Sequence, residues 1–182
     1  MRIVLATPLY PPEIAEPAPY VKELAKRLSK LHEVTIVAYA RLPEKVPGVR
    51  IVAVDKRQPL FIRLCVYFFA LVRNARRADI VYAMNGASVE LPVAIASLFT
   101  TGNLIIHIGD VAAHERAPRS WLTRSIERFA FSRARHVVTG APLRRPEIMP
   151  FEEYPNEKFA EYEASWQAHI RTIEDIFLHA KS

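Results

Sequence analysis

Apolar residues along the chain follow two alternating patterns. Short runs rich in β-branched residues indicate buried strands, and apolar residues at three- and four-residue steps indicate amphipathic helices. The short runs predict six strands, over 2–6, 33–39, 49–54, 79–84, 103–108 and 135–138. The longer periodic segments predict helices over 21–31, 59–77, 88–101 and 119–132. We expect Pro92 to lie in the first turn of the third of these helices, where proline is tolerated.

The C-terminal residues predict one further, long helix over 156–182. Its apolar residues again recur at three- and four-residue steps: Phe159, Tyr162, Trp166, Ile170, Ile173, Phe177 and Ala180. A proline-rich connection, 142–155, separates this helix from residues 1–141, which we interpret as one domain. We expect the helix to pack across that domain, since an unpacked apolar stripe would form a dimerisation surface.

The alternation of strands and helices predicts the fold class. Strands that are apolar throughout, rather than alternating, belong to parallel sheets covered on both faces. We therefore predict an α/β fold, a Rossmann-like, doubly wound parallel sheet of about six strands with the C-terminal helix packed across it. Such sheets bind ligands at the carboxyl ends of their strands, which directs attention to four loops: 7–19, 85–88, 109–118 and 139–145.

Composition removes several classes of site. The chain has 5 glycines and 14 prolines in 182 residues, and contains neither G-x-G-x-x-G nor G-x-x-x-x-G-K-[ST]. Cys65 is the single cysteine, so an internal disulfide framework and a cysteine-based zinc site are excluded, which fits a cytoplasmic protein. The 6 histidines lack the spacing of metal-binding motifs, and we expect no metal site. The longest apolar run, 64–72, is too short to span a membrane.

The formal net charge of +6 is unevenly distributed. Residues 147–175 carry eight acidic and two basic residues, so the remaining chain is strongly basic. The bases form two clusters: Lys56, Arg57, Arg63, Arg73, Arg76 and Arg77, and then Arg116, Arg119, Arg124, Arg128, Arg133, Arg135, Arg144 and Arg145. A solvated basic face explains them, and so does peripheral attachment to an anionic membrane surface at the inner face. Nucleic acid is disfavoured because no recognition motif is present.

Three segments resemble the N-terminal half of GT-B glycosyltransferases of family four. The loop TPLYPPEIAEPAPY with the helix after it resembles the strand–YPPEIGG-x-A–helix opening of that family. IGDVAAHERA, at 108–117, resembles its GD-x-x-x-x-ER-A segment, and IERFAFSRARHVVTGA, at 126–141, its RFxxxRADxVV-S stretch. The resemblance covers residues 1–141 in the expected order. It implies an acceptor-side domain of an enzyme that moves a sugar from a nucleotide-sugar to an acceptor hydroxyl.

The sequence departs from that family in two ways. Ala15 and Glu16 stand where the family has two glycines, and a Cβ and a carboxylate there oppose a close approach of donor phosphates. The family's C-terminal donor domain also has no counterpart here, since the residues after 141 are too few for a second such domain. We therefore expect no cofactor beyond the family's nucleotide-sugar donor, and no catalysis by these 182 residues alone.

The resemblance and the loop positions together nominate the site residues. We predict catalytic roles for Asp110, Glu115 and Arg116, because a carboxylate at a strand end can position an acceptor hydroxyl or stabilise an oxocarbenium-like transition state. The bland alternative is that Asp110 caps a turn and that Glu115 and Arg116 form a surface pair. The predicted substrate-binding residues are Pro12, Ala15, Glu16, Asn85, Gly86 and Gly109.

Three hypotheses for the function remain open on the sequence. The first is the acceptor half of a glycosyltransferase, with a nucleotide-sugar, an acceptor and the missing C-terminal domain as its partners. The second is a noncatalytic, natural or engineered, Rossmann-like association domain, with a homodimer as one form of it. The third is a basic peripheral-membrane module that uses the arginine clusters.

Overall fold

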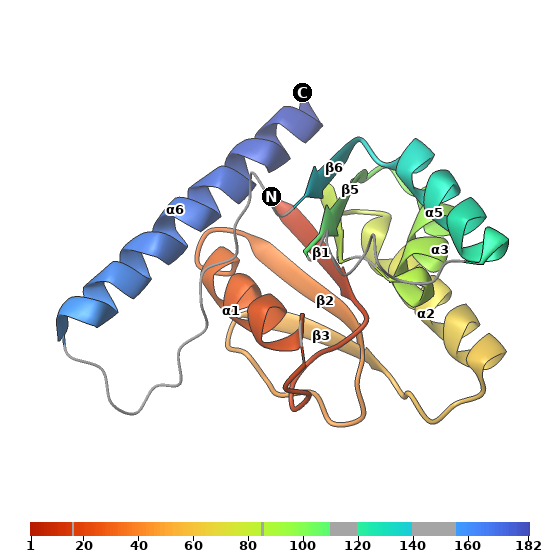
Figure 1. The fold of residues 1–182 in the computed structure, drawn as a ribbon, viewed down its shortest axis with the longest axis horizontal. Coiled ribbons are helices and arrows are strands. Elements are labelled where there is room, and N and C mark those ends of the chain that lie inside the picture. The colour runs from red at the N-terminus through yellow and green to blue at the C-terminus, as the bar shows by residue number, and fades with distance from the viewer. Residues whose placement is uncertain (16, 85, 110–119, 140–155) are drawn as a thin grey trace.

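Six parallel strands form one sheet in the order β3-β2-β1-β4-β5-β6 in a computed structural model (Figure 1). The structure describes residues 1–15, 17–84, 86–109, 120–139 and 156–182. The strands are β1 (Arg2–Thr7), β2 (Glu33–Tyr39), β3 (Val49–Val54), β4 (Ile80–Met84), β5 (Asn103–Ile108) and β6 (His136–Thr139). The sheet is parallel at every pairing, which confirms the predicted Rossmann-like α/β fold.

Helices cover both faces of the sheet, but unequally. They are α1 (Ala18–Leu28), α2 (Leu60–Ala75), α3 (Ala87–Ala96), α5 (Trp121–Arg133) and α6 (Asn156–Lys181). Figure 1 shows α2, α3 and α5 grouped on one side, with α1 and α6 on the other. Two separate buried apolar clusters, one on each face, correspond to these two layers.

The direction of the connections explains this division. The connection from β1 through α1 leads to β2, on one side of β1. The connections through α2, α3 and α5 all step in the opposite direction across the sheet. Because crossovers between parallel strands are right-handed, helices that step in opposite directions must lie on opposite faces. The connection through α1 therefore places its helix on one face of the sheet, and the connections through α2, α3 and α5 place theirs on the opposite face.

The long helix α6 covers the remainder of that face. Trp166, Ile173 and Phe177 on α6 are fully buried in the same cluster as Tyr20 of α1 and Tyr82 of β4. The ring of Tyr82 lies 5.5 Å from that of Phe177, and the ring of Tyr20 stacks on Trp166 at 5.9 Å. The predicted packing of the C-terminal helix across the sheet is confirmed, except that Phe159 in its first turn is half exposed.

Polar contacts connect α6 to the rest of the domain at several points along its length. The guanidinium of Arg27 donates to both carboxylate oxygens of Glu163, and its Nη1 lies 2.9 Å from Oε2. The Arg27 guanidinium holds the pKa of Glu163 below its usual value. The hydroxyl of Tyr20 and Nε2 of His169 share a buried hydrogen bond of 2.9 Å, and Lys181 bonds Asp79 at 3.0 Å. These contacts fix the helix in one position along the domain.

The predicted element boundaries agree closely for the strands and less well for one helix. Every strand begins and ends within one residue of its predicted position. Helix α3 ends at Ala96, earlier than predicted, and Pro92 lies in its interior, so the expectation of a first-turn proline is wrong. Pro92 has no amide hydrogen, so it cannot donate the helical hydrogen bond to the carbonyl of Ser88, four residues earlier. That carbonyl instead accepts a hydrogen bond of 2.9 Å from the hydroxyl of Tyr39.

The burial of α6 predicts a large difference between two substitutions on it. Trp166→Ala is expected to lower the free energy of unfolding by about 3–5 kcal/mol, because it removes a fully buried indole. Leu178→Ala, where the side chain is 57% exposed, should cost no more than about 0.5 kcal/mol. Urea denaturation followed by circular dichroism measures both. Equal, small losses would show that α6 is not part of the cooperatively folded core.

Candidate functional site

The strand order reverses between β1 and β4, and the loops that leave these two strands meet there. In open parallel sheets, ligands bind outside the carboxyl ends of the strands at this reversal, and we refer to that position as the crevice. Pro8 follows β1, and Gly86 follows β4 at the start of α3. A Cβ on Gly86 would lie 3.7 Å from Cγ of Pro8, and the φ of Gly86, +146°, is one that other residues rarely adopt. A side chain at position 86 would thus meet Pro8 only in ordinary van der Waals contact, and it is the φ that favours glycine here.

Two tyrosines support the strand ends beneath this crevice. The hydroxyl of Tyr67, in α2, shares its single proton between the carbonyl of Val37 at 3.0 Å and that of Thr7 at 3.3 Å. The ring of Tyr39, from the end of β2, stacks on that of Tyr67 at 4.3 Å. The guanidinium of Arg63 covers the Tyr39 ring at 5.3 Å. The ends of β1 and β2 are thus joined to helix α2.

The start of α3 is held by a buried carboxylate and by a tyrosine. Glu90, which is almost fully buried, accepts a hydrogen bond of 2.9 Å from the amide of Gly86. A side chain that reaches back to satisfy a first-turn amide stabilises a helix N-terminus. The hydroxyl of Tyr39 bonds the carbonyl of Ser88, which the interior Pro92 cannot use. The N-terminal turn of α3 is consequently fixed relative to β2.

The tyrosines of this region keep their protons well above neutral pH. Burial raises the pKa of Tyr39 to about 12, and it raises the pKa of Tyr10 to about 12 with a contribution from Glu44. Burial also raises the pKa of Tyr67 well above its ordinary value. All three hydroxyls therefore act as hydrogen-bond donors that hold backbone in place.

The outer part of the loop after β1 leans toward β2 and β3. The hydroxyl of Tyr10 donates to the carbonyl of Glu44, and the amide of Glu44 donates to the carbonyl of Pro11. Glu13 pairs with Lys56 at 2.8 Å, beyond the end of β3. Pro12 and Ala15 are exposed on this outer part of the loop. Pro8, at the start of this loop, lies beside Gly86 in the loop after β4.

The predicted site residues divide into two groups. Gly86 and Gly109 lie at the carboxyl ends of the adjacent strands β4 and β5, and Pro12 and Ala15 lie on the loop after β1. The other five lie outside the described residues: Glu16, Asn85, Asp110, Glu115 and Arg116. Across the described ranges, no group of three or more histidine, cysteine, aspartate or glutamate side chains is arranged to hold a metal ion.

Residues with structural importance for this crevice were not identified from the sequence. Tyr39, Tyr67 and Glu90 each sit in a predicted strand or helix, where the pattern assigns them to ordinary core or surface. The available signals were weak: a tyrosine inside an otherwise apolar helix, and a glutamate two residues before a proline in the next one. Only the three-dimensional contacts show that these side chains hold the strand ends.

Comparison of the sequence with protein families decides the family. The glycosyl transferase 4-like domain matches residues 16–145, which is most of the chain. The chain belongs to the glycosyl transferase 4-like family. This confirms the resemblance to family-four glycosyltransferases on which the site residues were nominated. No curated protein matches the chain.

Solved structures share the fold of this glycosyl transferase 4-like domain. Anabaena Alr3699/HepE in complex with UDP and glucose is 22% identical, with a TM-score of 0.51, over 75% of this chain and 37% of that chain. The C-terminal domain of the coenzyme A biosynthesis bifunctional protein CoaBC is 12% identical, with a TM-score of 0.50, over 96% of each chain. The domain thus spans well under half the length of HepE. Similarity at this level establishes the fold alone.

The raised tyrosine pKa values predict a loss of stability in alkali. The native state keeps protons that unfolded tyrosines, with a pKa near 10, release. The contribution of these tyrosines to the free energy of unfolding is therefore expected to be constant below about pH 10 and to fall between about pH 10 and 12. Urea denaturation at a series of pH values measures this, and an unchanged stability across that range would contradict it.

The shared hydrogen bond of Tyr67 predicts the effect of removing its hydroxyl. Tyr67→Phe leaves two backbone carbonyls without this donor and is expected to cost about 1–2 kcal/mol at neutral pH. Tyr10→Phe is the matched control, because Tyr10 is equally buried but its hydroxyl donates once, to a loop carbonyl at 3.2 Å. A loss in Tyr67→Phe no larger than in Tyr10→Phe would show that the Tyr67 bonds contribute little.

Proposed function

We propose that this domain forms the acceptor side of a GT-B glycosyltransferase, with the nucleotide-sugar donor held by a second unit outside these 182 residues. The observation that carries the proposal is the family match over 16–145, which spans the loops after β4 and β5. Support comes from the position of Pro8 and Gly86 at the strand reversal, since folds of this kind bind ligands at that edge of the sheet. HepE, which shares the fold, is described with UDP and glucose.

The proposed reaction places an acceptor hydroxyl at this crevice. Its oxygen attacks the anomeric carbon of the donor sugar, the bond from that carbon to the diphosphate oxygen breaks, and the nucleoside diphosphate leaves with the proton of the acceptor hydroxyl. Asp110 is proposed to orient the hydroxyl or stabilise the positive charge that develops on the sugar. Glu115 and Arg116 are proposed to complete the same loop, and Asn85, Gly86 and Gly109 to line the acceptor.

The loop after β1 is proposed to border the donor rather than to cradle its phosphates. Ala15 and Glu16 replace the pair of glycines that the family uses there, and Glu16 adds a negative charge. The outer part of this loop is bonded to the segments after β2 and β3, through Glu44 and Lys56. Pro12 and Ala15 are exposed, and so free to meet a second unit or its donor.

The small number of glycines allows a direct test of acceptor binding. A chain labelled with ¹⁵N only in glycine gives five backbone amide signals, two of which report on the crevice: Gly86 and Gly109. We expect glucose, as a minimal hydroxyl-bearing probe, to shift these two signals in a saturable way. Gly48 and Gly102 are the internal controls and should not move, because both precede strands at the opposite edge. UDP alone should shift none of these four glycine signals.

The outcomes of this titration separate two functions. Saturable shifts confined to Gly86 and Gly109 support the acceptor side of a transferase. Four unmoved signals with glucose and with UDP support the alternative, a noncatalytic association domain that keeps the fold without the site. A saturable shift of all four signals would indicate a global response and contradict the placement of the acceptor.

Because the proposal assigns the donor site to a second unit, it predicts that the isolated chain does not catalyse sugar transfer. The purified 182-residue protein, given UDP-glucose with or without a sugar acceptor, is expected to release no UDP above the background without enzyme. A coupled assay for UDP measures this. Asp110→Ala is the control variant: release by the natural sequence that disappears in Asp110→Ala would show that the chain catalyses alone.

A further inference from the structure

A cavity of about 620 Å³ lies at the edge of the sheet opposite the crevice. It is lined by the first residues of β1, β2 and β3 and by the C-terminal end of α2. Strands in a parallel sheet all begin at the same edge, and a helix that links them ends there, so these segments converge. The cavity is therefore separate from the loops that carry the proposed acceptor site.

Five arginines surround this cavity: Arg2, Arg50, Arg73, Arg76 and Arg77. All five side chains are exposed, and within the described part of the chain none of their guanidinium groups has a carboxylate within ion-pair distance. Glu33 is the acidic residue in the lining. Five guanidinium groups around one hollow repel each other, which an anionic ligand would relieve.

The dipole of α2 does not account for this number of charges. A cation in the last turn of a helix stabilises its C-terminus, and Arg73 is placed to do so. The effect falls off within one turn of the helix end, however. Arg2 and Arg50 come from β1 and β3, so the convergence of charge involves three separate elements.

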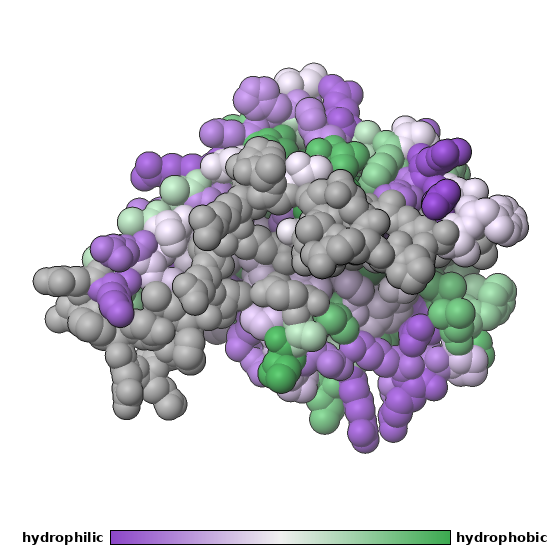
Figure 2. Space-filling view, viewed as in Figure 1, coloured by the Kyte–Doolittle hydropathy of each residue, from purple (hydrophilic) through white to green (hydrophobic). Residues whose placement is uncertain are grey.

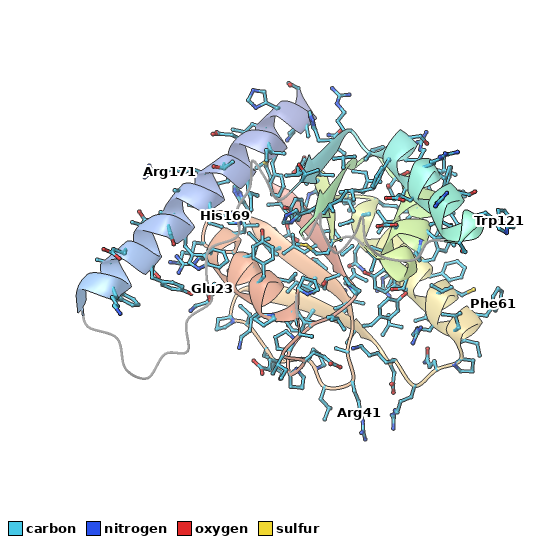
Figure 3. The ribbon with its side chains drawn as sticks, viewed as in Figure 1. Glu23, Arg41, Phe61, Trp121, His169 and Arg171 are labelled. Carbon is cyan, nitrogen blue, oxygen red and sulfur yellow. The ribbon has the colours of Figure 1, made fainter. Side chains whose placement is uncertain are left out.

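The solvent face of α2 carries exposed apolar residues that extend as far as this arginine-lined cavity. Ile62, Val66, Phe69 and Arg73 recur at steps of four, three and four, which places them on one face. The first three are exposed apolar side chains, and Phe69, 66% exposed, also lines the cavity. Further apolar side chains gather at the start of α2, where Phe61 is 78% exposed (Figures 2 and 3). One exposed surface thus combines an apolar stripe with a cluster of arginines.

The two helical layers also differ in charge. Residues 56–78, 86–109 and 120–139, which include α2, α3 and α5, carry ten basic and two acidic residues. Residues 18–31 and 156–182, which include α1 and α6, carry seven basic and six acidic residues. The excess positive charge lies on the same side as the apolar stripe of α2.

We propose that the solvent face of α2 docks on an anionic phospholipid bilayer, with a headgroup phosphate in the arginine-lined cavity and Ile62, Val66 and Phe69 against the lipid interface. Guanidinium groups match phosphate by paired hydrogen bonds, and exposed apolar side chains on a basic helix suit the boundary between headgroups and acyl chains. A soluble anion would leave the apolar stripe in water. No helix in the described ranges is long and apolar enough to cross a membrane, so the contact is peripheral.

Flotation of the protein with vesicles tests this directly. The wild-type protein is expected to float with phosphatidylglycerol vesicles, to remain unbound with phosphatidylcholine vesicles, and to be released by salt. The variant Arg73→Gln/Arg76→Gln/Arg77→Gln should lose roughly 100-fold in partition, at about one kcal/mol for each arginine. Phe69→Ser should lose about tenfold, since it removes an apolar side chain from the contact.

A matched variant separates the site from net charge. Lys30→Gln/Lys158→Gln/Arg171→Gln removes the same charge from exposed positions on the α1 and α6 side (Figure 3 labels Arg171). This variant is expected to bind phosphatidylglycerol within about twofold of wild type. The proposal is overturned by equal binding to both lipids, by no binding to either, by an equal loss in the two triple variants, or by an unchanged Phe69→Ser. None of these results depends on glycosyl transfer.

Discussion

The right-handedness of crossovers between parallel strands governs the architecture of this domain. Because one helical connection steps away from β1 in one direction and three step in the other, α1 lies on one face of the sheet and α2, α3 and α5 lie on the opposite face. A parallel sheet that is apolar on both faces cannot leave β4 and β5 uncovered. Helix α6 supplies the missing cover, through Trp166, Ile173 and Phe177.

The proline inside α3 leaves a backbone carbonyl of that helix available to a side chain from another element. A proline in a helix interior removes a backbone donor and leaves a carbonyl without its usual partner. In this domain that carbonyl belongs to Ser88, and the hydroxyl of Tyr39 from β2 bonds it. Tyr39 in turn stacks on Tyr67, which bonds the ends of β1 and β2. The carbonyl that Pro92 leaves without a helical donor is thus connected, through Tyr39 and Tyr67, to the ends of β1 and β2.

The sequence predicts the sheet well because its strands are short apolar runs separated by polar or proline-rich segments. The end of α3 was placed too late because residues 97–101 include apolar Leu98 and Phe99, which continue the helical pattern although the helix has ended. Gly86 is nominated from its position after a strand, and its role in a site is a prediction. Tyr39, Tyr67 and Glu90 were not nominated, because a pattern of apolar and polar positions does not reveal which hydroxyl or carboxylate meets which backbone group. The roles of Asp110, Glu115 and Arg116 rest on the family resemblance, and they remain predictions.

Helix α2 joins the two edges of the sheet as a single rod. It begins at the carboxyl ends of the strands, where Arg63 covers Tyr39, and ends about 24 Å away beside the arginine-lined cavity. Near its middle, the hydroxyl of Tyr67 anchors it to the backbone of β1 and β2. Through this anchor, a single helix connects the ends of β1 and β2 at one edge of the sheet with the arginine-lined cavity at the other.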